Sequence, residues 1–565
     1  MNLTIEPQLA WGIFARSLGA ILCVHFLSVL PQLLPLVGSK GLEPASWLFR
    51  AIKRDLGPVR RFSRFPSLFL INSSDWALVS VCVIGLLASF GIVLGGTVLG
   101  GIATPVLFFT AWVCWLSIQV ANPTVFSFPW DLLLTECAFF GSFLPPLAML
   151  PELGTTTVPH AAVAFYFNWL LFRVVFGMGI TRFRELGETE KDFTYIYHFL
   201  QWQPMPTPIA YYARMLPRIF HKLSFAFLFW AEVVAVFGVF GSPMFRAIAL
   251  VSIVLLQLGI WATGNYGTFS VLTLALCVPL LTALPGWGEI FSLSGPNPVL
   301  VFALTIHFVA SFPSFLLFNF WLNSLWVYQR KAMKEIAVGR ALLPLADFLR
   351  VFTPFRLLNS YGVFCHQNVY VRDRLVMRLQ GSVDGKEWKI YENLFLTSRN
   401  DKRPPLFAPY HPRLDHYLFY GLCEPHSLKF FMLMADNPYY FHSFCLTEKL
   451  VQKLLRNDRV ALSFFRKNPF ENEPPHFIRY AEYKYTFTSP EEKARTGEWW
   501  HSECIGVSEP ISKEPMEEGV GIQPVYDPFI SATQTLGDLD LREYRDPIAA
   551  KIVPMHRYPV MRFST

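Results

Sequence analysis

Residues 76–98 read WALVSVCVIGLLASFGIVLGGTV, and this stretch contains no Asp, Glu, Lys or Arg. An α-helix needs roughly 20 consecutive apolar residues to cross a bilayer core that is about 30 Å thick. The stretch is long enough and apolar enough to do so. It therefore predicts a membrane-spanning helix.

Similar stretches occupy most of the chain up to about residue 325. The whole chain of 565 residues is 53% hydrophobic and only 16% charged, with a mean hydropathy of +0.36, whereas soluble proteins are about 25% charged. The sequence predicts an α-helical polytopic membrane bundle of about nine spans, followed by a β-rich soluble C-terminal domain. The predicted spans are residues 11–34, 76–98, 102–121, 130–150, 159–182, 219–240, 244–263, 267–285 and 299–325.

Two long polar segments interrupt the apolar stretches, at residues 35–75 and 183–218. The first is basic, and Lys/Arg-rich loops favour the cytoplasmic side of a membrane. With nine spans, this rule places the C-terminal domain in the cytoplasm as well. The net charge of +7 is attributed to such loops. Outside the membrane part the basic residues form no stripe with interleaved aromatic residues, so nucleic-acid binding is not expected.

Four regions are predicted. Residues 1–328 form the transmembrane domain, 329–356 an amphipathic connector at the membrane surface, 357–510 the β-rich domain and 511–565 an extended tail. In the β-rich domain, alternation on both sides of Asp384-Gly385 predicts a hairpin over residues 375–390. A second strand is predicted over residues 477–488, and one or two short helices over 447–467.

The nine cysteines fall into two groups. Five lie in apolar stretches, where a lone cysteine is usually a small buried side chain. Four lie in the polar part and could form two disulfides in an oxidising compartment, with the pairing left open; these are Cys365, Cys423, Cys445 and Cys504. Residues 11–36 carry Arg16 and His25 and no A-x-A site follows them, so we interpret them as a first membrane helix and not as a cleaved signal.

Ionisable side chains inside the predicted spans are expensive, at about 2.5–3.5 kcal/mol each on insertion scales. Arg173 lies in the middle of a span and needs a carboxylate. We expect it to form an intramembrane polar cluster with Glu136 and Glu232. This cluster has two interpretations: an ion pair that holds the bundle together, or a polar cavity that binds a ligand or transfers protons.

Motifs of common enzymes are not found in the sequence. It contains no Walker loop, no G-x-S-x-G, no H-E-x-x-H and no strand followed by G-x-G-x-x-G. The histidines are dispersed, and no C-x-x-C is present. We therefore expect no catalytic residues, no metal and no cofactor.

Three motifs rich in proline and aromatic residues stand out in the polar parts: residues 203–212, residues 409–415 and residues 468–500. They are interpreted either as anchors from loops into the core, or as a rigid surface that holds another polypeptide. Arg413 and Asp415 are too close in sequence to face each other simply, so each is expected to anchor a different neighbour. The residues proposed to contact a client are Tyr410, Arg413, Asp415, Phe470, Trp499 and Trp500.

Further motifs follow one another along the chain: Gly41-Leu42-Glu43-Pro44, Phe128-Pro129-Trp130-Asp131, Gly177-Met178-Gly179, Gln203-Pro204-Met205-Pro206, Thr263-Gly264-Asn265-Tyr266, Asn359-Ser360-Tyr361-Gly362 and Gly497-Glu498-Trp499-Trp500. By their number and order, the chain resembles the lipase maturation factor family over about residues 12–510. Two positions depart from the family pattern, Gln201 in place of an acidic residue and His416 in place of Trp.

The resemblance implies a multi-pass protein of the endoplasmic reticulum membrane, or of the inner membrane for a bacterial source. It implies chaperone-like binding of an immature secreted lipase or similar client, without lipid hydrolysis, and a C-terminal domain that faces the lumen. This lumenal placement conflicts with the cytoplasmic placement inferred from the basic first loop. A miscounted span, or a first loop lying on the membrane, would remove the conflict.

The alternative function is a membrane enzyme whose intramembrane polar cavity acts on a lipid-like or quinone-like substrate. A deep pocket that converges on Arg173, Glu136 and Glu232 would favour the enzyme, and a dry, fully paired cluster would favour a scaffold. A transporter is a weaker third alternative, because no repeated halves with broken helices are evident.

Overall fold

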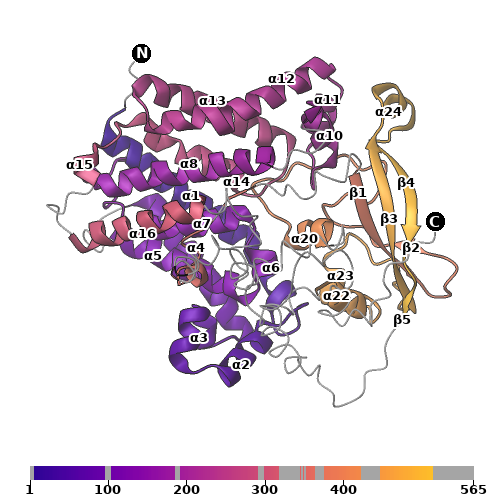
Figure 1. Cartoon of the computed structure of the whole chain (residues 1–565). Helices are drawn as coiled ribbons and strands as arrows, with labels where there is room; N and C mark the ends of the chain where they lie inside the picture. The colour runs from indigo at the N-terminus through magenta and orange to yellow at the C-terminus, as the bar shows by residue number, and fades with distance from the viewer. Residues whose placement is uncertain are drawn as a thin grey trace.

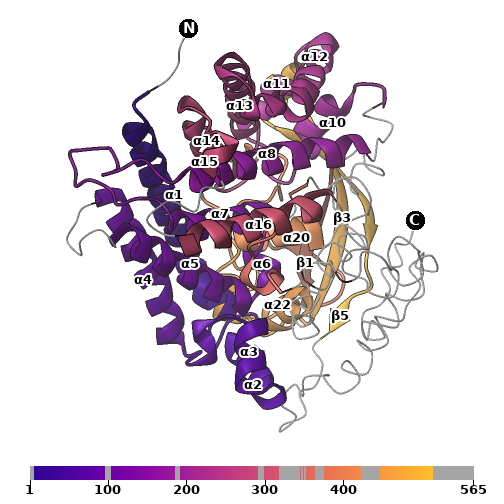
Figure 2. The same cartoon turned by 60° about the vertical axis from the view of Figure 1, so that its left-hand side comes forward.

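The computed structural model describes residues 5–95, 103–184, 191–290, 298–316, 344, 348, 351–359, 361–362, 374–421 and 446–512. The helices of the first half lie on one side of the molecule, and a small antiparallel sheet lies on the other (Figures 1 and 2). The predicted fold class, a helical membrane bundle followed by a β-rich C-terminal part, is confirmed.

Within the described residues, six helical segments are long and apolar enough to cross a membrane. They are apolar on nearly every face, so lipid tails and neighbouring helices are both suitable surroundings for them. The six are α1 (Pro7–Val37), α4 (Asp75–Leu94), α5 (Ala103–Ala121), α8 (Ala161–Arg184), the continuous segment of α12 (Arg218–Phe229), η3 (Trp230–Val234) and η4 (Ala235–Phe240), and α13 (Pro243–Thr263).

The other three predicted spans correspond to shorter apolar helical segments. These are α7 (Pro129–Gly141), α14 (Phe269–Leu276) with η5 (Val278–Leu281), and the Phe302–Phe312 part of α16 (Pro298–Leu316). The 13 residues of α7 rise only about 20 Å, which is less than the bilayer core. Pro145 and Pro146 follow it and oppose further helix. Nearly all of α7 is buried against protein, so it is a core helix of the bundle.

Close packing between the first helices depends on glycine. A Cβ on Gly85 of α4 would lie 2.3 Å from the ring of Phe26 on α1, and one on Gly19 of α1 would lie 2.7 Å from Ile92. Small residues permit such close approach between membrane helices. Gly91 of α4 likewise faces Leu107 of α5.

Short helices fill the two long loops. The first loop contains α2 (Ala45–Asp55), α3 (Pro58–Arg64) and η1 (Leu68–Leu70), and the second contains α10 (Tyr195–Trp202) and α11 (Pro208–Arg214). The remaining short helices of the membrane part and the connector are α6 (Pro123–Phe126), α15 (Trp287–Ile290) and η7 (Thr353–Phe355).

The sheet has the strand order β2-β1-β3-β4, with β5 pairing β3 at one end. Its strands are β1 (Arg374–Ser382), β2 (Lys389–Ile390), β3 (Phe477–Phe487), β4 (Trp500–Val507) and β5 (Ile511–Ser512). The predicted hairpin is confirmed: Gln380 pairs with Ile390, and Gly385 takes the positive φ of 73° that its turn requires. The predicted second strand is β3.

Four helices accompany the sheet: α20 (Arg413–Gly421), α22 (Leu446–Leu454), α23 (Arg459–Leu462) and α24 (Pro490–Thr496). The pair α22 and α23 confirms the helices predicted over residues 447–467. In both views α20 lies between the bundle and the sheet (Figures 1 and 2). It is therefore placed to connect the two halves.

Both long loops lie on the same side of the bundle as the C-terminal domain. Lys453 Nζ donates to the Lys40 carbonyl at 3.0 Å, and Lys449 pairs with Glu43 at 3.3 Å. On the second loop, the Gln201 side chain accepts from the Phe487 amide at 3.0 Å. The basic first loop and the C-terminal domain must therefore face the same compartment, so their common placement follows from contacts as well as from a span count.

The loop at residues 142–160 lies at the opposite end. The Thr155 amide donates to the Gln8 carbonyl, near the start of α1, whereas Gln32 near its end contacts the C-terminal domain. Gln8 and Gln32 are separated by about 36 Å of helix, more than the thickness of a bilayer core. Helix α1 therefore joins the two sides of the membrane.

Some predictions fall outside the described residues. These include almost all of the amphipathic connector at 329–356, the tail beyond residue 512, and Cys365, Cys423 and Cys445. Cys504 is exposed and forms no disulfide with another described cysteine.

We expect the first loop and the C-terminal domain to be accessible to antibodies from the same side of the membrane. Epitopes would be inserted at Gly57, between α2 and α3, and at Gly385, in the hairpin turn. Antibody access in cells with only the plasma membrane permeabilised should be the same for both epitopes. An epitope at Thr157 in the 142–160 loop should show the opposite accessibility. Different accessibility at Gly57 and Gly385 would contradict the arrangement.

Candidate functional site

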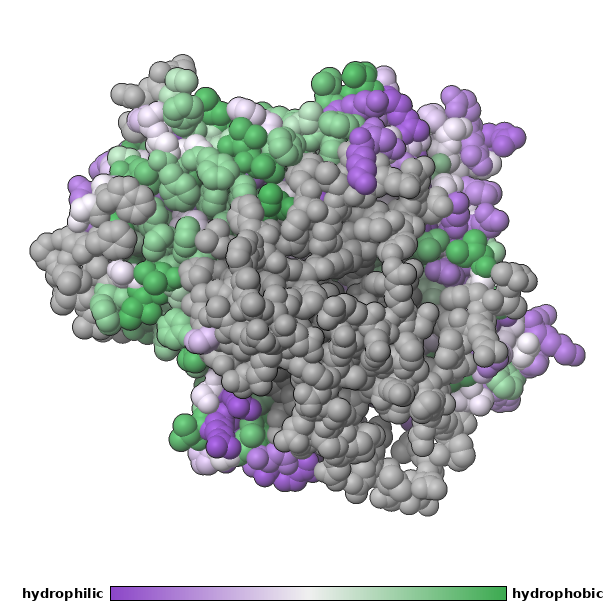
Figure 3. Space-filling model, in the orientation of Figure 1, coloured by the Kyte–Doolittle hydropathy of each residue, from purple (hydrophilic) through white to green (hydrophobic). Residues whose placement is uncertain are grey.

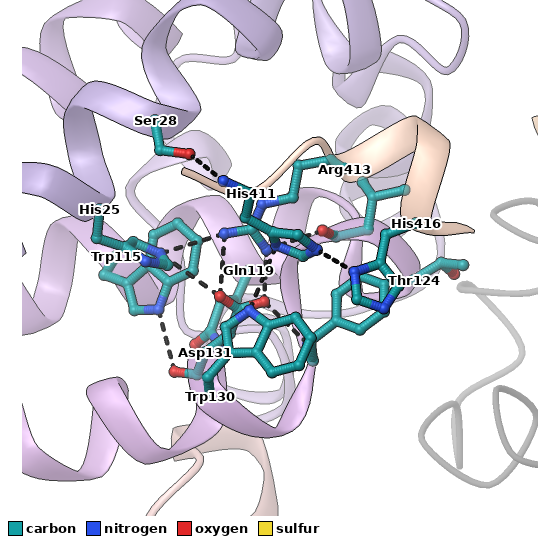
Figure 4. A network of polar contacts seen from close by, with 12 residues as sticks. His25, Ser28, Trp115, Gln119, Thr124, Trp130, Asp131, His411, Arg413 and His416 are labelled. Atoms are coloured by element: carbon teal, nitrogen blue, oxygen red, sulfur yellow. Dashed lines mark hydrogen bonds and ion pairs between the residues drawn. The ribbon is translucent and has the colours of Figure 1, made fainter. Parts of the chain in front are cut away.

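A buried ion pair joins the C-terminal domain to the bundle. Arg413, in the first turn of α20, is fully buried, and so is Asp131 of α7. The guanidinium binds both carboxylate oxygens, with Nη2 at 3.0 Å from Oδ1 and Nη1 bound to Oδ2. Nη1 also donates to the Val125 carbonyl at 3.1 Å. Figure 4 shows this bidentate arrangement, which is the strong, orientation-specific form of such a pair.

Three histidines surround this pair (Figure 4). His25 of α1 places Nε2 3.5 Å from Asp131 Oδ1. Trp130 Nε1 donates to His411 Nδ1 at 3.3 Å, so Nε2 of that imidazole carries the hydrogen and donates to His416 Nδ1 at 2.9 Å. The histidines thus extend the ion pair into a connected polar network.

Helix α1 holds the backbone of the 409–415 motif. Gln32 Nε2 donates to the His411 carbonyl at 2.9 Å, and its Oε1 accepts from the Arg413 amide at 2.8 Å. Ser28 Oγ accepts from the His411 amide at 3.0 Å. These bonds fix the entry to α20, and with it the direction of the Arg413 side chain. We call this assembly, Asp131, Arg413, His411, His416 and Gln32, the Arg413 junction.

Asp415 anchors a different segment, as expected. Its carboxylate accepts a hydrogen bond from the Leu396 amide at 3.2 Å. Burial raises the pKa of Asp415 to about 6, although this hydrogen bond acts to lower it. Burial also lowers the pKa of Lys402 to about 8, whose Nζ donates to the carbonyls of Asn393 and Leu394. Both charges therefore hold the 393–397 segment inside the C-terminal domain.

A second buried cluster surrounds Glu136 of α7. Arg173 of α8 forms an ion pair with it, and the hydroxyl of Tyr361 donates to it at 2.6 Å. Asn359 Nδ2 donates at 3.1 Å, and Tyr166 supplies a further hydroxyl. Both carboxylate oxygens are thus satisfied by protein groups, and the cluster joins α7 and α8 to the first residues of the C-terminal domain.

The third predicted member of this cluster, Glu232, has a different partner. It forms a buried ion pair with Arg182, which lies about 13.5 Å further along α8 than Arg173. Gly179 allows this contact, because a Cβ there would lie 2.6 Å from the Glu232 Cβ. The single cluster predicted from the sequence is therefore two separate pairs.

Four of the six predicted client contacts are inside the protein. The exposed fractions are 0% for Arg413 and Trp500 and 5% for Asp415 and Phe470, so their placement on a client-contacting surface is wrong. Trp500 stacks on Phe487 with ring centroids 4.2 Å apart, and Phe470 packs against Gly381. These aromatic side chains are large enough to stabilise the sheet's core. Only Tyr410 and Trp499 remain partly exposed.

Other residues that join the C-terminal domain to the membrane part were not assigned a role from the sequence. Asn265 Oδ1 accepts from the amides of Phe407 and Ala408, each at 2.9 Å, and its Nδ2 donates to the carbonyl of Pro405. Arg374 of β1 donates to the carbonyl of Pro204 at 2.8 Å. The signal available in the sequence was Asp131, a carboxylate in the predicted span 130–150, which contains no Lys or Arg that could neutralise it.

Among the described residues, no group of three or more His, Cys, Asp or Glu side chains is arranged to hold a metal ion.

The two charges of the Arg413 junction should be strongly coupled. Arg413→Met alone and Asp131→Leu alone each leave one buried charge unpaired, and each is expected to lower the free energy of unfolding by about 3–5 kcal/mol. The double variant should lose much less than the sum. Unfolding of the four proteins in detergent measures the coupling. The exposed pair Arg399 and Asp401 is the control, with little coupling expected; additive losses at the junction would contradict its structural role.

The junction should also weaken in acid. Burial lowers the pKa of His416 to about 3, and burial also lowers that of His411. An unfolded histidine binds a proton below about pH 6.5, so stability falls as the pH decreases from that value. For His416 alone the loss by pH 5 is about 2 kcal/mol. His416→Phe should flatten the dependence of unfolding on pH between 7 and 5, and an unchanged slope would contradict a buried neutral imidazole.

The comparisons with known proteins agree on one family. Residues 9–284 match the family model described as Lipase maturation factor transmembrane domain, and residues 357–510 match Lipase maturation factor C-terminal domain. Lipase maturation factor 1 of Bos taurus is 28% identical over 89% of both chains. Lipase maturation factor 2 of Homo sapiens is 26% identical over 87% of this chain and 81% of its own. No solved structure was found to match. The chain belongs to the lipase maturation factor family.

Proposed function

We propose that this protein is a membrane-anchored maturation factor that assists the folding or assembly of secreted lipases or related clients. Its similarity to proteins named lipase maturation factor extends over most of the chain. The observation that carries the proposal is the Arg413 junction, which fixes a folded C-terminal domain to the membrane bundle. A chaperone-like domain that is held rigidly at the membrane can meet its clients as they enter the secretory pathway.

We place the protein in the membrane of the endoplasmic reticulum, with its C-terminal domain in the lumen where secreted clients fold. The basic first loop then faces the lumen too, against the usual charge bias. Its helices support a position on the membrane surface, because Trp47, Val59 and Phe62 are exposed beside several arginines. Basic amphipathic helices bind lipid headgroups in this way, which reconciles the basic loop with a lumenal domain.

The client-binding surface is proposed at an aromatic cluster beside the junction. It consists of Phe395, Leu406, Phe407 and Tyr410, and we call it the Tyr410 cluster. The Phe395 and Phe407 ring centroids are 4.8 Å apart, and the Phe395 and Tyr410 centroids 5.4 Å apart. Leu406 is 64% exposed. An incompletely folded client exposes apolar surface, and an apolar surface rich in aromatic residues is suited to hold it.

The Glu136–Arg173 half of the predicted cluster does not support the enzyme alternative, and Glu232, which lines a cavity, is paired with Arg182. The Glu136–Arg173 cluster is buried and its carboxylate is paired on both oxygens, which is the arrangement expected of a scaffold. The carboxylate therefore has no accessible position for a substrate.

The proposal is tested in cells that lack their own lipase maturation factors and express a secreted lipase. The wild-type chain should restore secreted lipase activity per amount of lipase protein. Leu406→Glu places a charge in the client surface and should reduce co-precipitation of the immature lipase by about tenfold, the size of a hot-spot loss. Ile505→Glu, at an exposed apolar position on β4, is the matched control.

Two outcomes would contradict the proposal at different levels. Failure of the wild-type chain to restore any lipase activity would reject the maturation function. Restoration by wild type and equally by Leu406→Glu would reject the Tyr410 cluster as the client surface, while the maturation function would stand.

A further inference from the structure

A large apolar cavity lies between the second loop and the membrane helices α12 and α13. Its volume is about 860 Å³, within the range of about 300–1,000 Å³ that is usual for small-molecule sites. The walls come from α10, α11, α12 and α13, and apolar side chains dominate them, among them Phe199, Phe227, Leu228, Leu256 and Ile260. None of the residues that define the Arg413 junction lines this cavity.

One wall of the cavity carries a buried charged pair. Arg182 and Glu232 both line it and pair with each other. One wall thus carries a guanidinium and a carboxylate that neutralise each other, and the rest of the interior is mostly apolar, which suits a hydrocarbon chain.

The rim of the cavity is apolar. Leu216, Phe220 and Leu223 line it and are 41%, 48% and 62% exposed. Arg218 and Lys222 are exposed on the first turns of the same helix, α12, four residues apart and so on one face, which is opposite the face of Phe220 and Phe227 that lines the cavity. Figure 3 shows hydrophilic and apolar side chains next to each other over α11 and the start of α12. Basic residues at the membrane surface attract anionic lipid headgroups.

The position of the rim fits the boundary of the bilayer. Helix α12 begins on the side of the C-terminal domain, since the second loop contacts that domain, and it continues into a membrane-length segment. Arg218 and Lys222 therefore lie at headgroup depth and the cavity lies below them. An extended peptide entering so apolar a space would leave its backbone amides unpaired, whereas a hydrocarbon chain has none.

We propose that this cavity binds the acyl chain of a membrane lipid. The proposal is independent of the maturation function, because it concerns a site in the membrane part and requires no client. The bound chain would fill the space between α12 and α13 and so support the second loop, whose Gln203 and Pro204 carbonyls hold Arg374 of the C-terminal domain.

The chain offers a variant that blocks the cavity without disturbing its walls. Gly259 of α13 lines the cavity, and a Cβ there would meet no atom within 4 Å. Gly259→Phe therefore places a ring in the empty space, and the loss of a helix-interior glycine favours the fold. Gly288 of α15 also has no neighbour within 4 Å and does not line the cavity, so Gly288→Phe is the matched control.

The test uses the full-length protein in nanodiscs that contain a phosphatidylcholine analogue with a photoactivatable acyl chain. Cross-linked peptides are mapped by mass spectrometry. We expect adducts on the cavity-lining peptides of α12 and α13. Gly259→Phe should reduce these adducts by about tenfold, and Gly288→Phe should leave them unchanged.

Two results would overturn the proposal. The first is equal labelling of the cavity in wild type and Gly259→Phe. The second is labelling spread over exposed lipid-facing side chains such as Leu87 of α4, without enrichment in the cavity. Thermal unfolding of each variant in the same nanodiscs shows that a loss of labelling does not reflect misfolding.

Discussion

The ion pair between Arg413 and Asp131 is the interaction on which the arrangement of the two halves depends. The partners are 282 positions apart in the sequence and are both withdrawn from solvent. Such a pair contributes less to stability than its Coulomb energy suggests, because both ions lose their hydration. Its main effect is to exclude alternatives: any other docking of the C-terminal domain would leave two buried charges without partners.

Most of the motifs that mark the family become intelligible as parts of this docking. Asn265 holds the 405–408 segment, the carbonyls of the 203–204 segment hold Arg374, and Asn359 and Tyr361 reach Glu136. These residues come from loops that are distant in sequence. The polar group of each one binds the backbone or a charged side chain of another segment. A set of motifs that seemed suited to an external partner is therefore largely an internal joint.

The sequence was sufficient for the elements and insufficient for their partners. The apolar stretches predicted the membrane helices, and alternation around Asp384-Gly385 predicted the hairpin, because both patterns are local. Glu136 and Glu232 were indistinguishable as partners of Arg173, since the choice depends on where along α8 each helix crosses it. The burial of Trp500 and Arg413 was equally inaccessible, because aromatic and charged side chains in a proline-rich loop have the same local pattern whether they face a partner or a neighbouring domain. The 130–150 stretch was predicted to span the membrane, whereas its helix α7 is a short core helix. Hydropathy alone does not distinguish a core helix from a lipid-facing one.

The distance in sequence between the two charges also has a consequence for biosynthesis. At about 5–20 residues per second, the ribosome needs roughly 15 to 60 s to progress from Asp131 to Arg413. During that interval the carboxylate on α7 is already in the nascent bundle while its counter-ion does not yet exist. Until then the Asp131 carboxyl must be hydrated or protonated, and only the completed last third of the chain supplies its native counter-ion.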